Sequence, residues 1–462
     1  MSQSMPVPVV PRFRCFADSR AMARNPVEIL SRYNETFGDT FWIRIGGLKE
    51  AMVTIDPAVI QHVLKTNAEN YHKSEIQIKR MGHFLGKGLL TTHGEPWRTQ
   101  RRLIQKGFDR KQLDALSSIM QESLAESLRD FDRQVRSGPV DIYTHLMKIT
   151  FAMVARSLFG ARLKDEDIDL VSHTICTVQE FIVRQTLQPY LNPWFAVSGE
   201  LRKHEDMRTR ADAVLLEYIR KRRNEAPGHD LPRNDLLQTL MDARYSDGSS
   251  MPDELILSES MQLLVAGHET SSNALSWLLY LLSSRPDCLE KVRHEFDSVL
   301  GEAPVNYSDV PKFEFVTQVI CEALRLYPPF WMVDRMAIAD DRVGDVSIPR
   351  GSMVIVYVYG AHHAPRYWRN PESFNTERFT KENDKVRTPF TYLPFGAGPR
   401  GCIGGNYAML QILMILSGLL RRYDFQLAPG QMIEARPMVI LRPKHGIRMT
   451  FTSSVAAASC IA

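Results

Sequence analysis

The sequence predicts a mainly α-helical fold with a minor β portion, on the strength of two patterns along the chain. Segments with a helical hydrophobic period follow one another from Trp97 to about Gly301, separated by loops rich in Gly, Pro and Asp. Strand-like runs lie outside this region, near Thr40 and again after Tyr327. The sequence contains no fixed-period repeat, no low-complexity tract and no convincing interdomain linker. We therefore expect one domain spanning residues 1–462, large enough to enclose a cofactor.

The composition is that of an ordinary globular protein, with 44% hydrophobic and 24% charged residues. It excludes a disordered, collagen-like or fibrous chain. Lys and Arg total 57 against 53 Asp and Glu, and this net charge of +4 gives no global argument for nucleic-acid binding. The six cysteines show no metal-finger or disulfide spacing, which favours reduced thiols in a cytoplasmic protein.

Two segments are candidates for targeting or membrane elements. Residues 1–26 are punctuated by Pro and lack a basic and apolar signal peptide, so an extended surface segment is expected. The longest uncharged apolar stretch, Gly404–Leu420, contains Asn406 and Gln411 and is shorter than the roughly 20 residues of a spanning helix. We expect a buried helix there and no membrane anchor.

The β elements are predicted from alternating or β-branched runs. Thr40–Ile45 and Ala51–Ile55 flank Gly46-Gly47 and predict a hairpin, after which Pro57 opens a helix to about Lys65. Short strands are expected at Val346–Gly351 and Met353–Val358, and again in the last 40 residues.

The helical elements are predicted from hydrophobic periodicity. The expected segments are Lys111–Val135, Ile142–Phe159, Asp165–Gln188, Glu200–Asn224, Asp235–Ala243 and Glu254–Ser284. The last of these is unusually long and apolar on more than one face, so it should cross the core.

A cysteine in a Gly- and Pro-rich loop is the strongest chemical signal. The segment runs Phe395-Gly-Ala-Gly-Pro-Arg-Gly-Cys402-Ile-Gly404 and precedes the apolar helix. Backbone N–H groups of such a loop and the positive end of a helix dipole both favour a thiolate. Gly398 and Gly404 would allow close approach by a flat ligand, and Arg400 offers a cation for a carboxylate. A lone cysteine of this kind would usually belong to an ordinary turn, but the spaced set Phe-x-x-Gly-x-Arg-x-Cys-x-Gly argues otherwise.

That spaced set resembles the haem-binding loop of the cytochrome P450 family. The resemblance implies that Cys402 is the axial thiolate ligand of the iron in haem b, where thiolate donation favours O–O cleavage. It also implies that Phe395 packs beside the sulfur and that Arg400 pairs with a haem propionate.

A second motif, Ala266-Gly267-His268-Glu269-Thr270, interrupts the long helix with poor helix formers. Thr270 can bond back to the carbonyl of Ala266, and the alternative is a helix kink with a solvated acid. The motif resembles the oxygen-binding helix of the same family, which crosses over the haem. The resemblance implies that Ala266 and Gly267 lie at the cofactor, that Thr270 stabilises bound dioxygen and that Glu269 helps to deliver protons.

A third motif pairs Glu322 and Arg325, which share a helix face and alone would suggest a surface ion pair. In the family such a pair joins an Arg of a later segment, here Arg378, in a buried structural triad. Thr376 stands where the family more usually has Pro. We expect the triad to support the cysteine loop without taking part in catalysis.

Further residues match family positions at the haem edge. Trp97 and Arg101 share a helix face, and the resemblance implies that this pair and Arg335 contact propionates. His93 is a weaker candidate, equally consistent with a polar loop residue. A basic stripe recurs every four residues at Arg98, Arg102, Lys106 and Arg110. A solvated face is the alternative, but the resemblance implies a docking surface for an acidic ferredoxin or flavodoxin.

The resemblance also places substrate beside three stretches, roughly Ile76–Leu90, Ile175–Phe195 and Phe330–Val333, and beside the long helix. Their apolar content predicts a largely nonpolar substrate. The candidate pocket residues are Phe84, Leu85, Phe181, Leu263, Phe330, Trp331, Met332 and Val333.

Together these motifs and the resemblance that they carry imply a haem-thiolate monooxygenase that inserts one atom of O2 into a C–H bond by hydroxylation or oxidative dealkylation. Electrons would come from NAD(P)H through a ferredoxin or flavodoxin and its reductase. No fused reductase is expected, because the chain ends soon after the helix that follows Cys402, and we expect a cytoplasmic monomer. The alternatives are a peroxide-driven peroxygenase of the same fold and a non-catalytic haem sensor or carrier. Glu269 and Thr270 argue against both.

Overall fold

The computed structural model describes residues 7–45, 49–160, 163–224 and 235–453. The chain forms two compact units, each assembled from segments that lie far apart in the sequence. The β-rich unit comprises residues 1–74, 315–403 and 434–444, and the helical unit comprises residues 75–314, 404–433 and 445–462. The expectation of a single domain stays a prediction.

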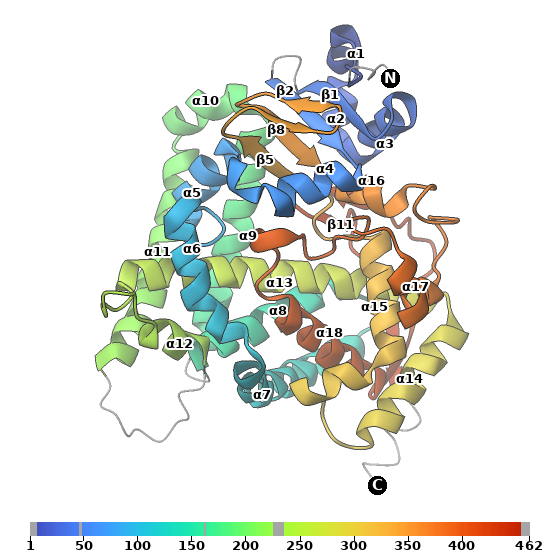
Figure 1. Cartoon of the computed structure of the whole chain (residues 1–462). Helices are drawn as coiled ribbons and strands as arrows, with labels where there is room; N and C mark the ends of the chain where they lie inside the picture. Colours follow the sequence, from blue (N-terminus) through green and yellow to red (C-terminus); the bar gives the residue numbers. More distant parts are fainter. Residues whose placement is uncertain (1–6, 46–48, 161–162, 225–234, 454–462) are drawn as a thin grey trace. The chain divides into compact units, whose positions relative to one another are not determined.

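A five-stranded sheet of order β1-β2-β8-β5-β3 organises the β-rich unit. The expected hairpin is confirmed, since β1 pairs with β2 antiparallel, with Phe41 opposite Val53; its Gly46-Gly47 turn lies outside the described residues. Strand β8 adds to β2 in parallel, with Ile355 opposite Val53, and Figure 1 shows the blue and orange strands side by side. The strands of this unit are β1 (Thr40–Ile45), β2 (Lys49–Thr54), β3 (Tyr71–His72), β5 (Val333–Ala337), β6 (Asp341–Val343), β7 (Val346–Ile348), β8 (Met353–Val356), β10 (Ala435–Pro437) and β11 (Leu441–Pro443).

The β-rich unit also contains mostly short helices. They are α1 (Arg12–Ala17), α2 (Ser19–Arg24), α3 (Pro26–Phe37), α4 (Pro57–Gln61), η1 (His62–Thr66), η2 (Ala68–Asn70), α15 (Glu314–Leu326), α16 (Val358–His363), η8 (Thr376–Phe379), α17 (Lys381–Val386) and η9 (Gly398–Arg400). The helix expected after Pro57 is present as α4 and η1, and Asp56 caps it by accepting from the amides of Ala58 and Val59.

The expectation of an extended N-terminal segment is wrong for residues 12–24, which form α1 and α2. Cys15 of α1 is buried, and its sulfur accepts a hydrogen bond from the amide of Arg44 in β1. Contact with the sheet therefore overrides the proline punctuation that suggested extended backbone.

The helical unit contains the long helices expected from periodicity. Its helices are η3 (Ile76–Met81), α5 (Gly82–Leu85), α6 (Gly94–Ile104), η4 (Gln105–Phe108), α7 (Arg110–Val135), α8 (Ile142–Phe159), α9 (Asp165–Leu187), η6 (Pro189–Leu191), α10 (Asn192–Val197), α11 (Glu200–Asn224), α12 (Leu236–Asp242), α13 (Asp253–Ser283), α14 (Pro286–Leu300), η7 (Tyr307–Lys312) and α18 (Gly405–Leu420). Its strands are β4 (Val140–Asp141), β9 (Tyr423–Leu427) and β12 (Arg448–Ser453).

Helix α13 forms the core of the helical unit, as its apolar faces predict (Figure 1, yellow-green). It packs against α8 and α18 and is buried on several faces. The apolar stretch expected to be a buried helix is α18, with most of its side chains buried. Within the described residues, no helix has the length and apolar character needed to cross a bilayer.

Candidate functional site

The Cys402 loop of the β-rich unit is folded by two short backbone hydrogen bonds. The Cys402 amide donates to the Phe395 carbonyl at 2.8 Å, and the Gly401 amide donates to the Gly398 carbonyl at 3.0 Å. Cys402 is exposed, whereas Phe395 and Arg400 are half-buried. The loop thus presents a thiol at its surface, and the thiolate form expected from the sequence stays a prediction.

Gly398 is required by the protein's own backbone. Its φ is +68°, and a Cβ at this position would lie 1.8 Å from the carbonyl oxygen of Leu64 in η1. The sequence suggested that the missing side chain admits a flat ligand. The structure corrects this, because the backbone of η1 takes the place of the missing side chain.

Gly404 is a different case, at the start of α18 in the helical unit. Its φ is −92°, and a Cβ here would meet only Phe108, at an ordinary 3.7 Å. The surrounding protein atoms therefore do not explain a glycine at this position, and the predicted approach of a ligand remains consistent with the structure.

The predicted triad is assembled in the β-rich unit around the fully buried Glu322. Its carboxylate accepts from Arg325 Nε and Nη2 at 2.7 and 2.8 Å and from Arg378 Nε at 3.3 Å. The amide of Asn375 adds a bond at 2.8 Å. Arg325 in turn donates to the carbonyls of His362 and Ser373. The carboxylate is thus fully compensated inside the unit, as a buried charge requires.

His362 connects this triad to the cysteine loop and was missed by sequence reasoning. Its Nδ1 donates to the Arg325 carbonyl at 3.2 Å, and its Nε2 accepts from the Leu393 amide at 2.8 Å, two residues before Phe395. The bond accepted at Nε2 needs the neutral imidazole, and complete burial lowers the pKa of His362 to about 3. A His in a helix gives no local sign of such a role, because its partners lie far apart in the sequence.

Arg335 lies in β5 with its guanidinium almost fully buried. Burial lowers its pKa, which the neighbouring Asp334 partly offsets. Its Nη1 donates a hydrogen bond to the carbonyl of Asp334 at 2.7 Å. A guanidinium has five donors, so most of its hydrogen-bonding capacity remains for an anionic group.

The acid and threonine motif lies inside α13 of the helical unit. Thr270 Oγ1 donates to the Ala266 carbonyl at 2.8 Å, which is the back-bond expected from the sequence. Ala266 is exposed although Leu264, Val265 and His268 around it are buried. This otherwise buried helix is therefore exposed on one face at Ala266. Thr270 lies one turn further along that same face.

The opposite side of the motif is fixed by α8. A Cβ on Gly267 would lie 3.0 Å from the side chain of Val154, so helix packing accounts for this glycine and its contact with a cofactor stays a prediction. Thr150 Oγ1 lies 3.0 Å from the His268 carbonyl, and His268 Nδ1 donates to the Leu264 carbonyl at 2.7 Å. Complete burial lowers the pKa of His268 to about 4, so the ring is neutral near pH 7.

Helix α6 carries the remaining predicted haem contacts, Trp97 and Arg101. Trp97 is buried and Arg101 half-buried, one turn apart. The neighbouring basic stripe needs correction, because α6 ends at Ile104 and Asp109 leaves the helical conformation to cap α7. The four basic residues are all exposed but do not lie on one continuous helix; they are Arg98, Arg102, Lys106 and Arg110.

The predicted substrate residues separate into buried and open sets. In the helical unit, Phe84 and Phe181 are buried in edge-to-face contact, with ring centroids 6.0 Å apart; Leu85 is also buried, and Leu263 on α13 is half-buried. In the β-rich unit, Phe330 is 45% and Met332 36% exposed, and Val333 is half-buried.

Trp331 corrects one expectation. It was expected to line the substrate pocket, but its ring is buried in the core of the β-rich unit and Nε1 donates to the Met438 carbonyl at 2.9 Å.

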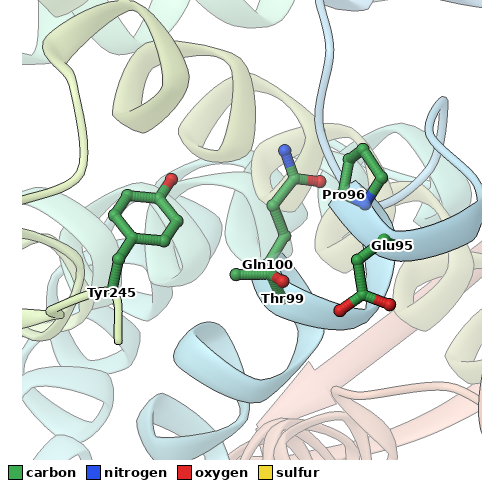
Figure 2. Close-up of a pocket in the computed structure, with 5 residues that line it drawn as sticks. All are labelled: Glu95, Pro96, Thr99, Gln100 and Tyr245. Carbon is green, nitrogen blue, oxygen red and sulfur yellow. The ribbon is translucent and has the colours of Figure 1, made fainter. Parts of the chain in front are cut away.

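A surface pocket of about 360 Å³ lies in the helical unit, and none of the predicted substrate residues lines it. Figure 2 shows Tyr245 across the pocket from four residues of α6, which are Glu95, Pro96, Thr99 and Gln100. None of the five lining residues carries a role in the predicted chemistry.

Comparison with solved structures identifies the class of fold. The heme domain described as cytochrome P450DA superposes with a TM-score of 0.84 at 21% identity, covering 98% of both chains. A triple mutant of the same domain gives a TM-score of 0.85 at 22% identity. This likeness shows the fold expected from the sequence, helix-rich with a minor sheet portion.

Sequence comparison identifies the family. The profile described as Cytochrome P450 matches residues 5–451. Cyclooctatin synthase of Streptomyces melanosporofaciens is 30% identical over 91% of this chain and 90% of its own. Protein LUTEIN DEFICIENT 5, chloroplastic, of Arabidopsis thaliana is 28% identical over 90% of this chain and 72% of its own. The chain belongs to the cytochrome P450 family. It is a haem-thiolate monooxygenase that uses haem b and O2, with electrons from NAD(P)H delivered through partner proteins.

Each unit, taken by itself, has residues with features that suit such a cofactor. In the β-rich unit, the buried Arg335 guanidinium has donors suited to a carboxylate, and Cys402 lies exposed in its loop. In the helical unit, the opening at Ala266 and the space at Gly404 suit a flat group. Each observation is independent of the family match.

Proposed function

We propose that this enzyme inserts one oxygen atom of O2 into a C–H bond of a largely nonpolar small molecule, by hydroxylation or oxidative dealkylation. The observation that carries the proposal is the Thr270 hydroxyl, back-bonded to Ala266 beside Glu269 in the interior of α13. Adjacent hydroxyl and carboxyl groups can hold and pass on protons. A relative named cyclooctat-9-en-7-ol 5-monooxygenase, whose name describes oxygenation of an unsaturated alcohol, supports the apolar substrate class.

In this proposal the Cys402 thiolate would hold the haem iron, and Phe395 would pack beside the sulfur. When bound, the haem supplies an iron centre that activates dioxygen, with electron density donated by the thiolate. Cationic and indole N–H groups bind the propionates; they come from Trp97, Arg101, Arg335 and Arg400.

The protein's own groups control water and protons around the substrate. Apolar side chains such as Phe84, Phe181 and Leu263 exclude water and favour a nonpolar substrate. The Thr270 hydroxyl, held by the Ala266 carbonyl, would hold a proton at Oγ1 and release it during turnover, and Glu269, half-buried on the same helix, would replace that proton.

The electron donor in this proposal is a separate acidic protein, a ferredoxin or flavodoxin served by its own reductase. The exposed Arg102, Lys106 and Arg110 supply positive charge for steering, while Arg98 is already paired with Glu95 at 3.1 Å. Such steering weakens as salt is added. We propose a monomer acting in the cytoplasm, which the absence of disulfide spacing among the six cysteines supports.

The decisive experiment is the spectrum of the reduced protein with carbon monoxide. The wild type should give the red-shifted band of thiolate-ligated haem, and Cys402→Ser should abolish it because serine cannot supply a thiolate. Cys288→Ser, at a half-buried cysteine of α14, should keep the band. A wild type without the band would overturn the assignment of Cys402.

A further inference from the structure

The loop of residues 86–92 has little regular structure, and side chains from two helices hold its backbone. Gln262 of α13 and Gln100 of α6 are both buried, at 2% and 6% exposure. The Leu90 amide donates to Gln262 Oε1 at 2.7 Å, while Gln262 Nε2 lies within 3.2 Å of the Leu85 and Gly86 carbonyls. From the other side, Gln100 Nε2 donates to the Lys87 carbonyl at 3.3 Å.

Two glycines and a threonine of the loop allow the side-chain amide of Gln262 to bind its backbone. Gly86 has φ +73°, and its carbonyl accepts from Thr91 Oγ1 at 2.6 Å. Thr91 Oγ1 also accepts from Gln262 Nε2 at 3.0 Å. A Cβ on Gly88 would lie 2.7 Å from the Gln262 amide, so only glycine leaves room for it. The buried Glu259 adds a bond from the Leu89 amide at 3.1 Å.

The position of Gln262 on α13 connects the 86–92 loop to the predicted reaction site. Gln262, Ala266 and Thr270 are spaced four residues apart and therefore share one face of the helix. The loop follows Phe84 and Leu85, and Phe84 packs against Phe181 of α9. The Gln262 amide thus ties the apolar segment to the helix face that bears Ala266 and Thr270.

We propose that Gln262 is a positioning residue for substrate selection: it fixes the 86–92 loop against α13 and thereby sets the size of molecule accepted beside Ala266. The inference rests on the proposed function. It assigns Gln262 no contact with substrate, because its amide is occupied by the loop backbone.

The first test is hydrogen exchange of the loop. Gln262→Met keeps the length of the side chain and removes its hydrogen bonds, so amides of residues 86–92 should exchange about tenfold faster, the loss expected for one or two buried hydrogen bonds. Gln426→Met, at an exposed position of β9, should leave exchange of the loop unchanged. Unchanged exchange in Gln262→Met would overturn the proposal.

A second variant reaches the same contact from the loop side. Gly88→Ala should displace the Gln262 amide and reproduce the faster exchange. Gly82→Ala is the matched control, because its Cβ would meet Thr91 at an ordinary 3.7 Å and should change nothing. In a double variant, Gly88→Ala should add little to Gln262→Met, since both remove the same contact.

The third test measures selection in the haem-loaded protein. Affinities for 1-alkylimidazoles of increasing chain length are read from the haem spectrum, because imidazole binds iron whatever the natural substrate. The wild type should discriminate among chain lengths, and Gln262→Met should reduce the discrimination about tenfold while the carbon monoxide band is kept. Equal affinities across chain lengths in the wild type, or unchanged discrimination in the variant, would contradict the proposal. Failure of the proposed function can be distinguished from failure of the Gln262 proposal. If the proposed function is wrong, the wild type lacks the carbon monoxide band, whereas the faster hydrogen exchange of Gln262→Met is still observed.

Discussion

Single hydroxyl and carboxyl groups decide the chemistry at the residue scale. Thr270 has a hydroxyl held by one carbonyl, so the group is positioned yet still able to change partner. In Glu322 the opposite holds, since both arginines and a backbone amide occupy its oxygens. The Thr270 hydroxyl is therefore suited to a reaction, whereas the Glu322 carboxylate is held in place.

Replacing Thr270 with Ala should uncouple electron use from product formation. Loss of the hydroxyl should lower product formed per NAD(P)H by at least about tenfold and release the electrons as hydrogen peroxide, because proton delivery loses its direction. Product and peroxide are measured against NAD(P)H consumed with a ferredoxin donor. Thr270→Ser keeps the hydroxyl and should remain coupled; equal coupling in Thr270→Ala would count against the proton role.

Replacing Glu322 with Gln should destabilise the β-rich unit strongly. The change leaves Arg325, which is fully buried, without its counter-charge and should cost about 3–5 kcal/mol in the free energy of unfolding. Urea unfolding of the haem-loaded protein measures this. Glu382→Gln, at an exposed position of α17, should change stability by no more than about 0.5 kcal/mol. Equal effects of the two variants would contradict the structural role.

The predicted site residues show what a sequence can and cannot provide at this scale. The back-bond of Thr270 and the pairing of Glu322 with Arg325 follow from fixed helical spacing, so they were predictable. The orientation of Trp331 was not, because its partner Met438 is distant in the sequence. His362 was missed for the same reason.

At the element scale, boundaries are predictable where a capping residue marks them. Helix α8 begins and ends where its sequence indicates, since Asp141 caps it and Gly160 ends it with φ +73°. The prediction of a basic stripe along one helix face was wrong, because the four-residue spacing of the basic residues continues past the end of α6. Asp109, which accepts from the Gln112 amide, was the signal that a new helix starts there.

The contact between η9 and η1 yields a prediction about the cysteine loop. Gly398→Ala should destabilise the protein through both the positive φ and the collision with Leu64, and should weaken the thiolate band in the carbon monoxide spectrum. Gly351→Ala is the control: it has φ +80° but open space, and should cost only the conformational strain of about 1 kcal/mol. Thermal unfolding separates the two, and an equal loss in both would show that the η1 contact does not matter.

At the scale of the whole molecule, one buried neutral histidine in each unit predicts acid sensitivity. The pKa of His268 is lowered to about 4 and that of His362 to about 3 by burial. In the unfolded chain both titrate near 6.5, so between pH 6.5 and 4 the unfolded state binds more protons. Stability should therefore fall with decreasing pH in this window, by about 1.4 kcal/mol per pH unit for each histidine.

Urea unfolding at several values between pH 7 and 4.5 measures that slope. His268→Gln and His362→Gln should each be less stable at pH 7, and each should reduce the pH dependence by one proton. His294→Gln, at an exposed position of α14, is a suitable control and should leave the slope unchanged. A slope that is unchanged in both variants would show that other groups titrate in this window.

The parallel pairing of β2 with β8 has a consequence for how the chain is made. About 300 residues separate the two strands, so ribosomal synthesis leaves the inner edge of β2 unpaired for roughly 15–60 s. The intervening residues 75–314 can meanwhile fold into much of the helical unit, whose contacts are more local. An exposed strand edge invites pairing with other chains. A lower growth temperature, or co-expression of chaperones that bind unfolded chains, should therefore improve the yield of folded enzyme. Either would protect the β1–β2 hairpin from pairing with other chains until β8 has been synthesised.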